Sequence, residues 1–404
     1  MSTENSPAED PRELGLDREK VEALLERAGQ EVREGLLSSA QVAIARHGRI
    51  AAMRTWGSAV QGGVEAPATN ATLYPVFSCT KAIVAAAAWI LIGERRLDPA
   101  ERVAEIIEEF RINGKQAVTV EQLLMHTCGF PNAPMPPLEW PNRRKRLDRF
   151  ASWRLEWPPG SRFVYHPTAS FWVLAEIIER RSGSDFRAFI HDRIAVPAGL
   201  EDLTIGLDRS KHSRVADLVL VHEPPAAPEL KRIGLPDSNQ SAADAERALL
   251  GINQPAVREI GIPGGGGLMT AGALALFYQS LLGHLDGSRD LGIWRRDTLE
   301  AVLRPCSGEL IEPMLGIRVN RALGVVLAGD DGRGTYRGFG AGNSAAAFGH
   351  GGAGGQIGWA DPASGLSFAY CTNGMDRNFI RHGLRGVALS TLAADCVSQT
   401  GKFN

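Results

Sequence analysis

The chain has 404 residues, 44% of them hydrophobic, so it can bury a sizeable core and hold two or three average domains or one large domain with an insertion. Its 44 basic and 46 acidic residues give a formal net charge of −2, which argues against nucleic acid or an acidic membrane surface as a partner. The five cysteines are widely spaced and form no C-x-x-C pair, so we expect neither a disulfide framework nor a zinc site, and no cofactor.

The N-terminal segment carries no predicted secretion signal. Residues 1–20 are polar and acidic, without the basic and apolar regions of a signal peptide. No apolar run reaches the roughly 18 residues that a membrane span needs. These features predict a cytoplasmic protein with no membrane partner. Residues 1–16 have a composition typical of flexible chain.

The first predicted elements form a helix, a hairpin and a buried helix. Apolar residues at helical spacing from Asp17 to about Leu36 predict an amphipathic helix. Two short apolar segments around His47-Gly48 predict a β-hairpin. After Phe77-Ser78-Cys79-Thr80-Lys81, the apolar run from Ala82 to Ile92 predicts a helix that is buried nearly all round and ends at Gly93.

The next part of the chain is predicted to be helical and rich in loops. A turn at Leu97-Asp98-Pro99 leads into a short helix, and Thr119 is a candidate cap for a second one. Loop-rich chain follows to residue 146. The basic cluster Arg143-Arg144-Lys145-Arg146 is interpreted as a solvated helix face, with a targeting or anion site as the alternative.

Two further segments precede the C-terminal third. A strand-like run from Arg162 to Tyr165 leads into a predicted helix from Phe171 to Arg181. Residues 221–267 are the least regular part of the sequence and contain the run Gly264-Gly265-Gly266-Gly267. An irregular stretch of this length indicates a lid, a binding loop or an insertion.

The C-terminal third is predicted to contain most of the sheet. After helical spacing at residues 271–282 and 297–303, strand periodicity from Leu315 to Thr372 predicts four or five antiparallel strands, and Phe379 to Val397 predicts a terminal helix. The economical fold is α/β (α+β), with one antiparallel sheet flanked by the N- and C-terminal helices. We expect the sheet domain to span residues 17–92 and 310–400, an inserted helical region to span 93–309, and the active site to lie between them.

Ser78 and Lys81 form the first candidate chemical motif. Residues three apart are neighbours on a helix, and a serine at a helix start lies at the positive end of the macrodipole, which suits a nucleophile that yields an oxyanion. The ordinary alternative for an S-x-x-K sequence is an N-cap serine and a solvated lysine. Of seven lysines only Lys81 follows a serine at this spacing, and a free lysine rarely precedes eleven apolar residues.

A serine activated by a lysine also needs a proton shuttle and donors for the oxyanion. Tyr165, which lies between a strand-like run and a helix, is a candidate for the shuttle, and a buried tyrosine with a satisfied hydroxyl is the alternative. The segment Phe348 to Gly355 is a glycine-rich strand edge where backbone N–H groups can approach a ligand, or else a tight hairpin.

These three motifs, in this order, resemble those of the serine β-lactamase and penicillin-binding-protein superfamily, specifically its class C-like branch with the family VIII carboxylesterases. The resemblance covers about residues 35 to 395 and implies a β-lactamase/transpeptidase-like fold. The further matching blocks are Gly93 to Asp98, Gln122 to Phe130, Pro159 to Tyr165, Gly265 to Thr270, His350-Gly351-Gly352, Gly358-Trp359 and Asp361-Pro362.

The resemblance implies a role for each motif. Ser78 attacks an acyl carbonyl, Lys81 and Tyr165 form the base system, and the backbone N–H groups of Ser78 and Ala353 hold the oxyanion. His126 is expected to be structural, and no metal is expected. The candidate substrate contacts are His350, Gly351, Gly352, His166, Trp359 and Phe130, and Trp153 and Trp157 are further candidate wall residues, with core packing as the alternative for the aromatic ones.

Two departures from the family pattern bear on the substrate. His166-Pro167 follows Tyr165 where β-lactam-processing relatives have Tyr-x-Asn. His350 replaces the lysine that meets a substrate carboxylate, and Gly351 removes a threonine hydroxyl. A neutral or weakly charged site favours uncharged esters. We therefore predict a serine hydrolase that cleaves small uncharged carboxylic esters through a Ser78 acyl-enzyme.

Other functions remain as alternatives to ester hydrolysis. The same residues would serve amide or β-lactam hydrolysis, or acyl transfer to another acceptor. An alternative of a different class is a non-catalytic binding protein with this fold. An α/β-hydrolase is excluded, because the chain has no G-x-S-x-G and its candidate oxyanion segment lies late in the chain instead of upstream of the nucleophile.

Overall fold

A computed structural model of the protein describes residues 8, 10–232 and 240–397. Its main feature is an antiparallel sheet of eight strands in the order β10-β11-β12-β13-β14-β1-β2-β3. β1 (Ser39–Arg46) forms the predicted hairpin with β2 (Arg49–Gln61) and pairs on its other side with β14 (Leu366–Thr372). The first strands of the chain thus complete the sheet that the last strands form, as predicted.

The remaining strands of this sheet differ in part from the prediction. The strand expected at residues 345–348 begins only at Phe348, because residues 344–347 form a turn in which Ala347 N–H donates to the Ser344 oxygen. Asp361 anchors this turn by accepting hydrogen bonds from the Ser344 N–H and hydroxyl. The predicted strand at residues 316–319 lies outside the sheet, in a hairpin of β8 (Ile311–Glu312) and β9 (Ile317–Arg318). The other strands of the sheet are β3 (Val64–Pro67), β10 (Arg321–Ala322), β11 (Val325–Leu327), β12 (Phe348–Gly352) and β13 (Gln356–Asp361).

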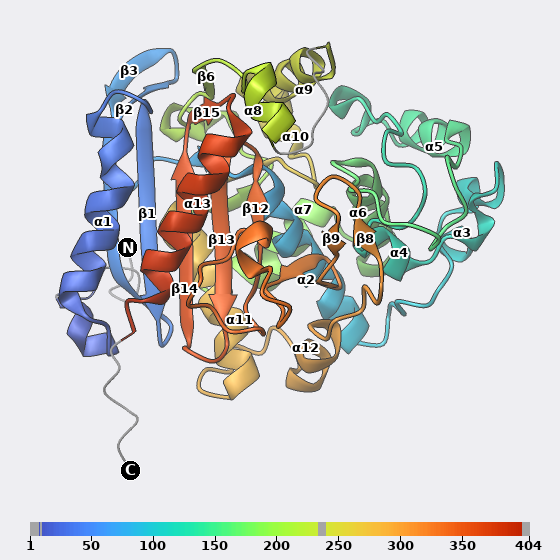
Figure 1. Ribbon diagram of the computed structural model, residues 1–404. Coiled ribbons are helices and arrows are strands. Elements are labelled where there is room, and N and C mark those ends of the chain that lie inside the picture. Colours follow the sequence, from blue (N-terminus) through green and yellow to red (C-terminus); the bar gives the residue numbers. More distant parts are fainter. Residues whose placement is uncertain (1–7, 9, 233–239, 398–404) are drawn as a thin grey trace.

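Helices cover both faces of the sheet (Figure 1). On one face lie α1 (Arg18–Arg33) and α13 (Phe379–Ala394), which pack against each other. On the other lie α11 (Ala271–Asp286) and α2 (Thr80–Gly93). Side chains of β1 alternate between the two cores, as the pleat of a strand requires. α11 lies within the region predicted as an insertion, yet it packs on β1, β13 and β14.

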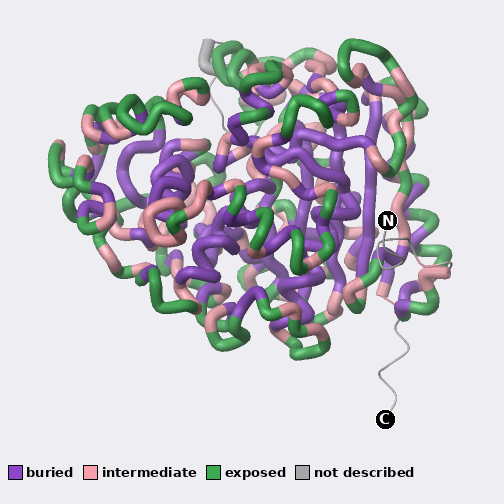
Figure 2. Tube along the Cα trace, turned by 180° about the vertical axis from the view of Figure 1, so that it is seen from behind, coloured by how far each residue is buried: buried purple, intermediate pink, exposed green. Residues whose placement is uncertain are grey.

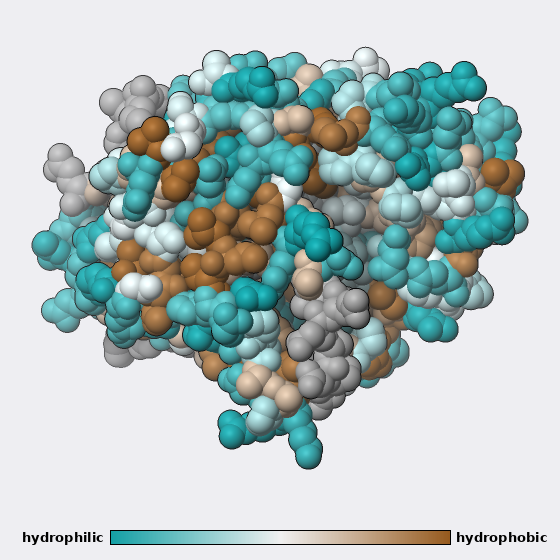
Figure 3. Space-filling view, turned by 90° about the horizontal axis from the view of Figure 1, so that it is seen from above, coloured by the Kyte–Doolittle hydropathy of each residue, from teal (hydrophilic) through white to brown (hydrophobic). Residues whose placement is uncertain are grey.

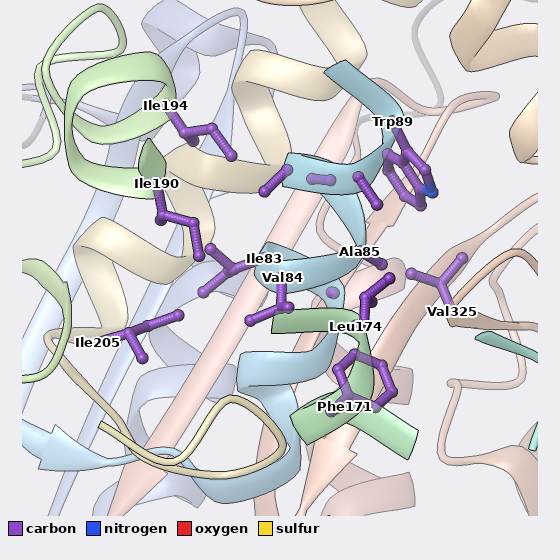
Figure 4. Close-up of a cluster of buried hydrophobic side chains, with 14 of the residues drawn as sticks. Ile83, Val84, Ala85, Trp89, Phe171, Leu174, Ile190, Ile194, Ile205 and Val325 are labelled. Carbon is purple, nitrogen blue, oxygen red and sulfur yellow. The ribbon is translucent and has the colours of Figure 1, made fainter. Parts of the chain in front are cut away.

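α2 is buried nearly all round, as its composition predicts. Every residue from Thr80 to Leu91 is buried. In Figure 4 its side chains Ile83 and Val84 lie among apolar side chains of the neighbouring helices, and Ala85 lies beside Leu174 and Val325. Figure 2 shows that the buried segments concentrate in the sheet and the central helices. None of the helices in the described ranges has the length and apolar character that a membrane crossing requires.

Most of the inserted helical region lies to one side of the sheet, beyond β12, and its later helices lie above the sheet (Figure 1). Thr119 caps α4 through a capping box with Gln122, as its sequence predicts. The segment 221–267, predicted to be irregular, is mostly helical where the structure describes it. In one of its helices Pro255 stands at the first position, where proline starts a helix instead of breaking it. The helices of the region are α3 (Val103–Ile106), α4 (Val120–Leu124), α5 (Arg143–Ser152), α6 (Ala169–Ser182), α7 (Phe186–Ile190), α8 (Ala227–Arg232), α9 (Gln240–Leu250) and α10 (Pro255–Ile260), with α12 (Arg296–Val302) following α11.

Two predictions about polar segments are wrong in part. Residues 1–7 and 9 of the segment predicted to be flexible lie outside the described residues, but Pro11–Leu14 forms a 3₁₀ helix capped by Asp10, because Leu14 is buried in the core beneath α1. In the basic cluster, Arg146 is not solvated. Its guanidinium lies 2.8 Å from Glu176 and 2.5 Å from Glu179, over the ring of Trp140.

Candidate active site

Ser78 lies in a 3₁₀ turn, Phe77–Cys79, that leads directly into α2. Phe77 has a φ of +45°, a value that side chains other than glycine rarely adopt, so the backbone turns sharply before the serine. Phe77 and Cys79 are buried, whereas Ser78 is half-buried. The hydroxyl therefore stands accessible at the positive N-terminal end of a buried helix.

Lys81 is fully buried beside this hydroxyl. Its Nζ lies 3.2 Å from Ser78 Oγ, 2.7 Å from the carbonyl oxygen of Pro167 and 2.6 Å from that of Gly264. Burial lowers the pKa of Lys81. A neutral amine has two hydrogens and one lone pair, so the two carbonyl oxygens accept the hydrogens and the lone pair remains for Ser78. The geometry suits Lys81 as the acceptor of the Ser78 proton.

Gly264 brings its carbonyl to Lys81 by a close backbone approach. A Cβ at this position would lie 2.9 Å from the Pro167 oxygen and 3.1 Å from Thr168 Cα, both tighter than ordinary contact. Sequence reasoning missed Gly264 and Pro167, because their contribution is a backbone oxygen. The signal in the sequence is the glycine run at residues 264–267, which lies in the segment predicted to be a lid, a binding loop or an insertion.

Tyr165 completes the contacts of Ser78. Its hydroxyl lies 2.8 Å from Ser78 Oγ. The predicted strand-like run before Tyr165 is not a strand, because its backbone groups bond to His126 instead of a neighbouring strand. Val164 N–H donates to the His126 carbonyl oxygen at 3.3 Å, and His166 N–H donates to His126 Nδ1 at 3.2 Å. The His126 ring also packs on the Tyr165 ring, with centroids 4.7 Å apart, so His126 acts as a support for this segment.

His166 and Phe130 do not face a substrate, contrary to the prediction. His166 is fully buried, its Nδ1 lies 2.6 Å from the Val164 oxygen, and its Nε2 accepts from Phe130 N–H at 3.1 Å. Burial lowers the pKa of His166 to about 4, so its ring is neutral. Phe130 is 1% exposed and packs against aromatic rings that include Trp153. Both residues lie at sequence positions next to the motifs, but their side chains belong to the core.

Strand β12 brings His350, Gly351, Gly352 and Ala353 beside the serine turn. A Cβ on Gly352 would lie 2.3 Å from the Val76 oxygen, so only glycine lets β12 approach the chain that enters this turn. Ala353 is half-buried and directly follows β12. Gly351 is exposed.

His350 contributes no positive charge to this edge. Its side chain is buried, its Nδ1 lies 2.7 Å from the Gly351 oxygen, and its Nε2 has no partner among the described residues. Burial lowers the pKa of His350 well below its ordinary value, so the imidazole is neutral. Where the family pattern has a lysine, this chain has an uncharged ring.

The tryptophans are core residues. Trp359 is 1% exposed and lies on the other face of the sheet, where its Nε1 donates to Ser390 Oγ at 3.1 Å, so its assignment as a substrate contact is wrong. Trp153 is buried and donates from Nε1 to the Pro134 oxygen, and Trp157 packs edge-on against the ring of His166. A strand alternates its faces, and Trp359 stands on the face opposite α2.

Sequence reasoning also missed Arg321 and an apolar border. Arg321, in β10, is buried with its guanidinium over the rings of Phe163 and Tyr165. An apolar cluster that includes Phe77 borders the serine turn, with Ala353 and Met375 at its margin. On the upper face of the molecule, hydrophobic side chains gather among hydrophilic ones (Figure 3). Within the described ranges, no three His, Cys, Asp or Glu side chains are grouped so that they would hold a metal ion.

Comparisons with known proteins find relatives in both sequence and structure. A sequence profile described as Beta-lactamase matches residues 21–393. The chain is 27% identical over 319 residues to the Esterase/beta-lactamase LipL of Mycobacterium tuberculosis, which covers 74% of this chain and 68% of that protein. It is 30% identical over 213 residues to Esterase EstB of Burkholderia gladioli, covering 48% of this chain and 54% of EstB, so the match spans about half of that protein. A solved penicillin-binding protein homolog from Caulobacter crescentus has a TM-score of 0.74 and 29% identity, covering 94% of this chain and 99% of that one.

Proposed function

The chain belongs to the beta-lactamase family, and we propose that it is a serine hydrolase that cleaves small uncharged carboxylic esters through an acyl-enzyme on Ser78. The likeness to the Caulobacter structure confirms the predicted α/β fold with an antiparallel sheet. The observation that carries the proposal is the single hydrogen-bonded group in which Lys81 Nζ and Tyr165 OH both contact Ser78 Oγ. Two relatives are named esterases, which supports the choice of ester.

Acylation begins with the proton of Ser78. As Oγ attacks the ester carbonyl carbon, its proton passes to the lone pair of Lys81, and the carbonyl π electrons move to the oxygen. The backbone N–H groups of Ser78 and Ala353 stabilise that oxyanion. The helix start at Ser78 adds the positive end of the α2 dipole.

Tyr165 serves the leaving group. When the tetrahedral intermediate collapses, the bond from carbon to the alcohol oxygen breaks, and the alkoxide takes the phenolic proton. Lys81, now an ammonium, returns a proton to the phenolate, which restores the pair. Water then attacks the acyl carbon with its proton passing to the same pair, and Ser78 leaves with a proton. Each proton that the pair accepts is returned within the cycle.

The surroundings of Ser78 favour an uncharged acyl group. The neutral imidazole of His350 offers no cation to a substrate carboxylate. The half-buried residues Ala353 and Met375, at the margin of the apolar cluster that includes Phe77, offer hydrophobic surface to an alkyl chain. β-Lactam hydrolysis is a second candidate, because the name of LipL covers both activities and the same serine would serve both.

Activity and labelling with matched variants test the proposal. The full-length protein is assayed with p-nitrophenyl butyrate, nitrocefin and a short p-nitroanilide, and it is incubated with a fluorophosphonate before intact-mass analysis. We expect turnover of the ester, one adduct on Ser78, and loss of both in Ser78→Ala. Absence of turnover and adduct with folded protein would refute the hydrolase and favour a binding protein. Faster turnover of nitrocefin than of the ester would reverse the order of the two candidate substrates.

A further inference from the structure

Arg321 is a buried cation that lacks a counter-charge. Its side chain is 7% exposed, and its Nη1 has no hydrogen-bond partner in the described part of the chain. Among the described residues, no carboxylate oxygen lies within 4.0 Å of the Arg321 guanidinium nitrogens, the limit for an ion pair. Burial of an unpaired charge costs free energy, so this position is unfavourable for stability alone.

The guanidinium is held against the candidate base system. Its Cζ lies 5.7 Å from the ring centroid of Tyr165 and 5.5 Å from that of Phe163, within the range of cation–π attraction. The backbone of Arg321 is fixed from its other side. Its N–H donates to Ser307 Oγ at 3.1 Å, and its carbonyl accepts from Cys306 N–H at 2.9 Å.

The titratable groups around this pair come from several elements. Tyr165 is faced by Lys81 of α2, His126 after α4 and His350 of β12. The pKa of both histidines is lowered mainly by burial and, second, by the charge of Arg321. Burial is also the main cause that lowers the pKa of Lys81, and Arg321 adds to it. Cys306, whose pKa burial raises to about 12, stays a neutral thiol, and Glu312 acts on Arg321 from beyond ion-pair distance.

Among these groups Arg321 keeps its charge at neutral pH. Burial lowers its pKa to about 10, which is still well above neutrality. A guanidinium therefore remains positive under conditions in which the buried imidazoles of His126 and His350 are neutral.

We propose that Arg321 is a positioning residue of the reaction, whose fixed charge keeps a surplus proton off the pair formed by Lys81 and Tyr165. The inference rests on the proposed function. In the working state the pair holds one proton, on the phenol, and the Lys81 amine is free. A second proton would convert the amine to an ammonium with no lone pair for Ser78. Arg321 opposes that proton through its field, and it neither gives nor takes a proton itself.

The size of the effect follows from the distance. Lys81 Nζ lies 5.0 Å and Arg321 Cζ 5.7 Å from the centroid of the Tyr165 ring, so the two charges are at most about 11 Å apart. At that separation and an effective dielectric constant of about 20 the interaction corresponds to about one pH unit, so removal of the charge should shift the acidic limb of the activity profile upward by about one pH unit. The direction is fixed, because loss of a neighbouring cation makes protonation of the pair easier.

A different use of the same charge would be an anchor for a substrate carboxylate. Of the guanidinium nitrogens, only Nη1 is fully enclosed without a partner among the described residues, so kinetics must separate the two uses. The two uses predict different kinetics. An anchor changes KM for anionic substrates alone. The electrostatic field of Arg321 on Lys81 and Tyr165 changes the pH profile for every substrate.

The test compares Arg321→Met and Arg321→Gln, which remove the charge, with Arg321→Lys, which keeps it. Arg146→Met is the matched control, since Arg146 is also a buried arginine over an aromatic ring, 4.3 Å from the centroid of Trp140, but pairs with Glu176 and Glu179. kcat/KM is measured from pH 5 to 9 with p-nitrophenyl butyrate and with a hemiglutarate ester, together with Tm and the activity of Ser78→Ala.

We expect the neutral variants to move the acidic limb upward for both esters, to approach wild-type activity at alkaline pH, and to keep or raise Tm. Arg321→Lys should retain the acidic limb of the wild-type pH profile. Arg146→Met should lower Tm but leave the acidic limb where it is. The inference would be overturned if the acidic limb of the neutral variants did not move, or if their kcat/KM fell equally at every pH. It would also be overturned if kcat/KM fell for the anionic ester alone, or if neither neutral variant folded. An active Ser78→Ala would instead refute the proposed function, so the two failures are distinguishable.

Discussion

Gly264 offers a direct test of how Lys81 is positioned. In Gly264→Ala the new Cβ would start 2.9 Å from the Pro167 oxygen and 3.1 Å from Thr168 Cα, whereas ordinary contacts begin near 3.4 Å. Both neighbours are backbone atoms, so one of the two segments must move by about 0.5 Å, and each carries a carbonyl that holds Nζ. We expect a loss of about 1 to 3 kcal/mol of stability, as for other overpacked sites.

The substitution should also slow the reaction. A displacement of 1 Å in a reacting group can reduce the rate about a hundredfold, so we expect kcat to fall about tenfold to a hundredfold with KM nearly unchanged. The assay is steady-state hydrolysis of p-nitrophenyl butyrate well below Tm, with the folded fraction checked by circular dichroism.

Gly383→Ala is the control for Gly264→Ala. A Cβ at Gly383, inside α13, would meet no atom within 4 Å. It should raise stability by up to about 1 kcal/mol, because alanine favours the helix, and leave kcat unchanged. A Gly264→Ala enzyme with wild-type kcat would show that the two carbonyl contacts of Lys81 are not needed for the reaction.

Three further outcomes are expected. Tyr165→Phe should lower kcat by about 10² to 10⁴ with little change in Tm, measured on the same ester, and retention of more than a tenth of kcat would contradict its role with the leaving group. His350→Lys adds a cation at the β12 edge, so it should lower KM for an ester with a carboxylate on its acyl group by about tenfold relative to p-nitrophenyl butyrate. An equal effect on both esters would count against the assignment of position 350 to the substrate site. Burial lowers the pKa of His166 from 6.5 to about 4, so the neutral ring should contribute about 3 kcal/mol to the free energy of unfolding above pH 6.5. This contribution should be lost as the pH falls toward 4. Urea unfolding at pH 7.5 and 4.5 measures the difference, and equal stability at the two pH values would contradict it.

The parts of the fold that the sequence predicted are those with strong local patterns. α2 is recognisable because its apolar run has no polar face, and the hairpin of β1 and β2 because His47-Gly48 supplies residues with positive φ. The pair Ser78 and Lys81 is local as well, since helical spacing alone brings their side chains together. Tyr165 is distant in sequence, and only its place in an ordered set of motifs pointed to it.

What the sequence did not reveal depends on backbone groups and on the face of a strand. The carbonyl oxygens of Pro167 and Gly264 hold Lys81 without any side chain that a motif search would register. Trp359 and His166 adjoin motif residues in the sequence, which is why they are predicted to lie in the site. Trp359 instead faces α13, and His166 is bonded to backbone in the core. Arg321 stands alone in a two-residue strand, so nothing in its neighbourhood marked it.

The central claim is that Ser78 carries the acyl group during turnover. Rapid-quench intact-mass analysis of the full-length enzyme with p-nitrophenyl butyrate, followed by peptide mapping, measures this directly. We predict a transient butyryl adduct on the peptide that contains Ser78, formed together with a burst of p-nitrophenol and absent in Ser78→Ala. Turnover without any adduct, or an adduct and full activity in Ser78→Ala, would contradict the account.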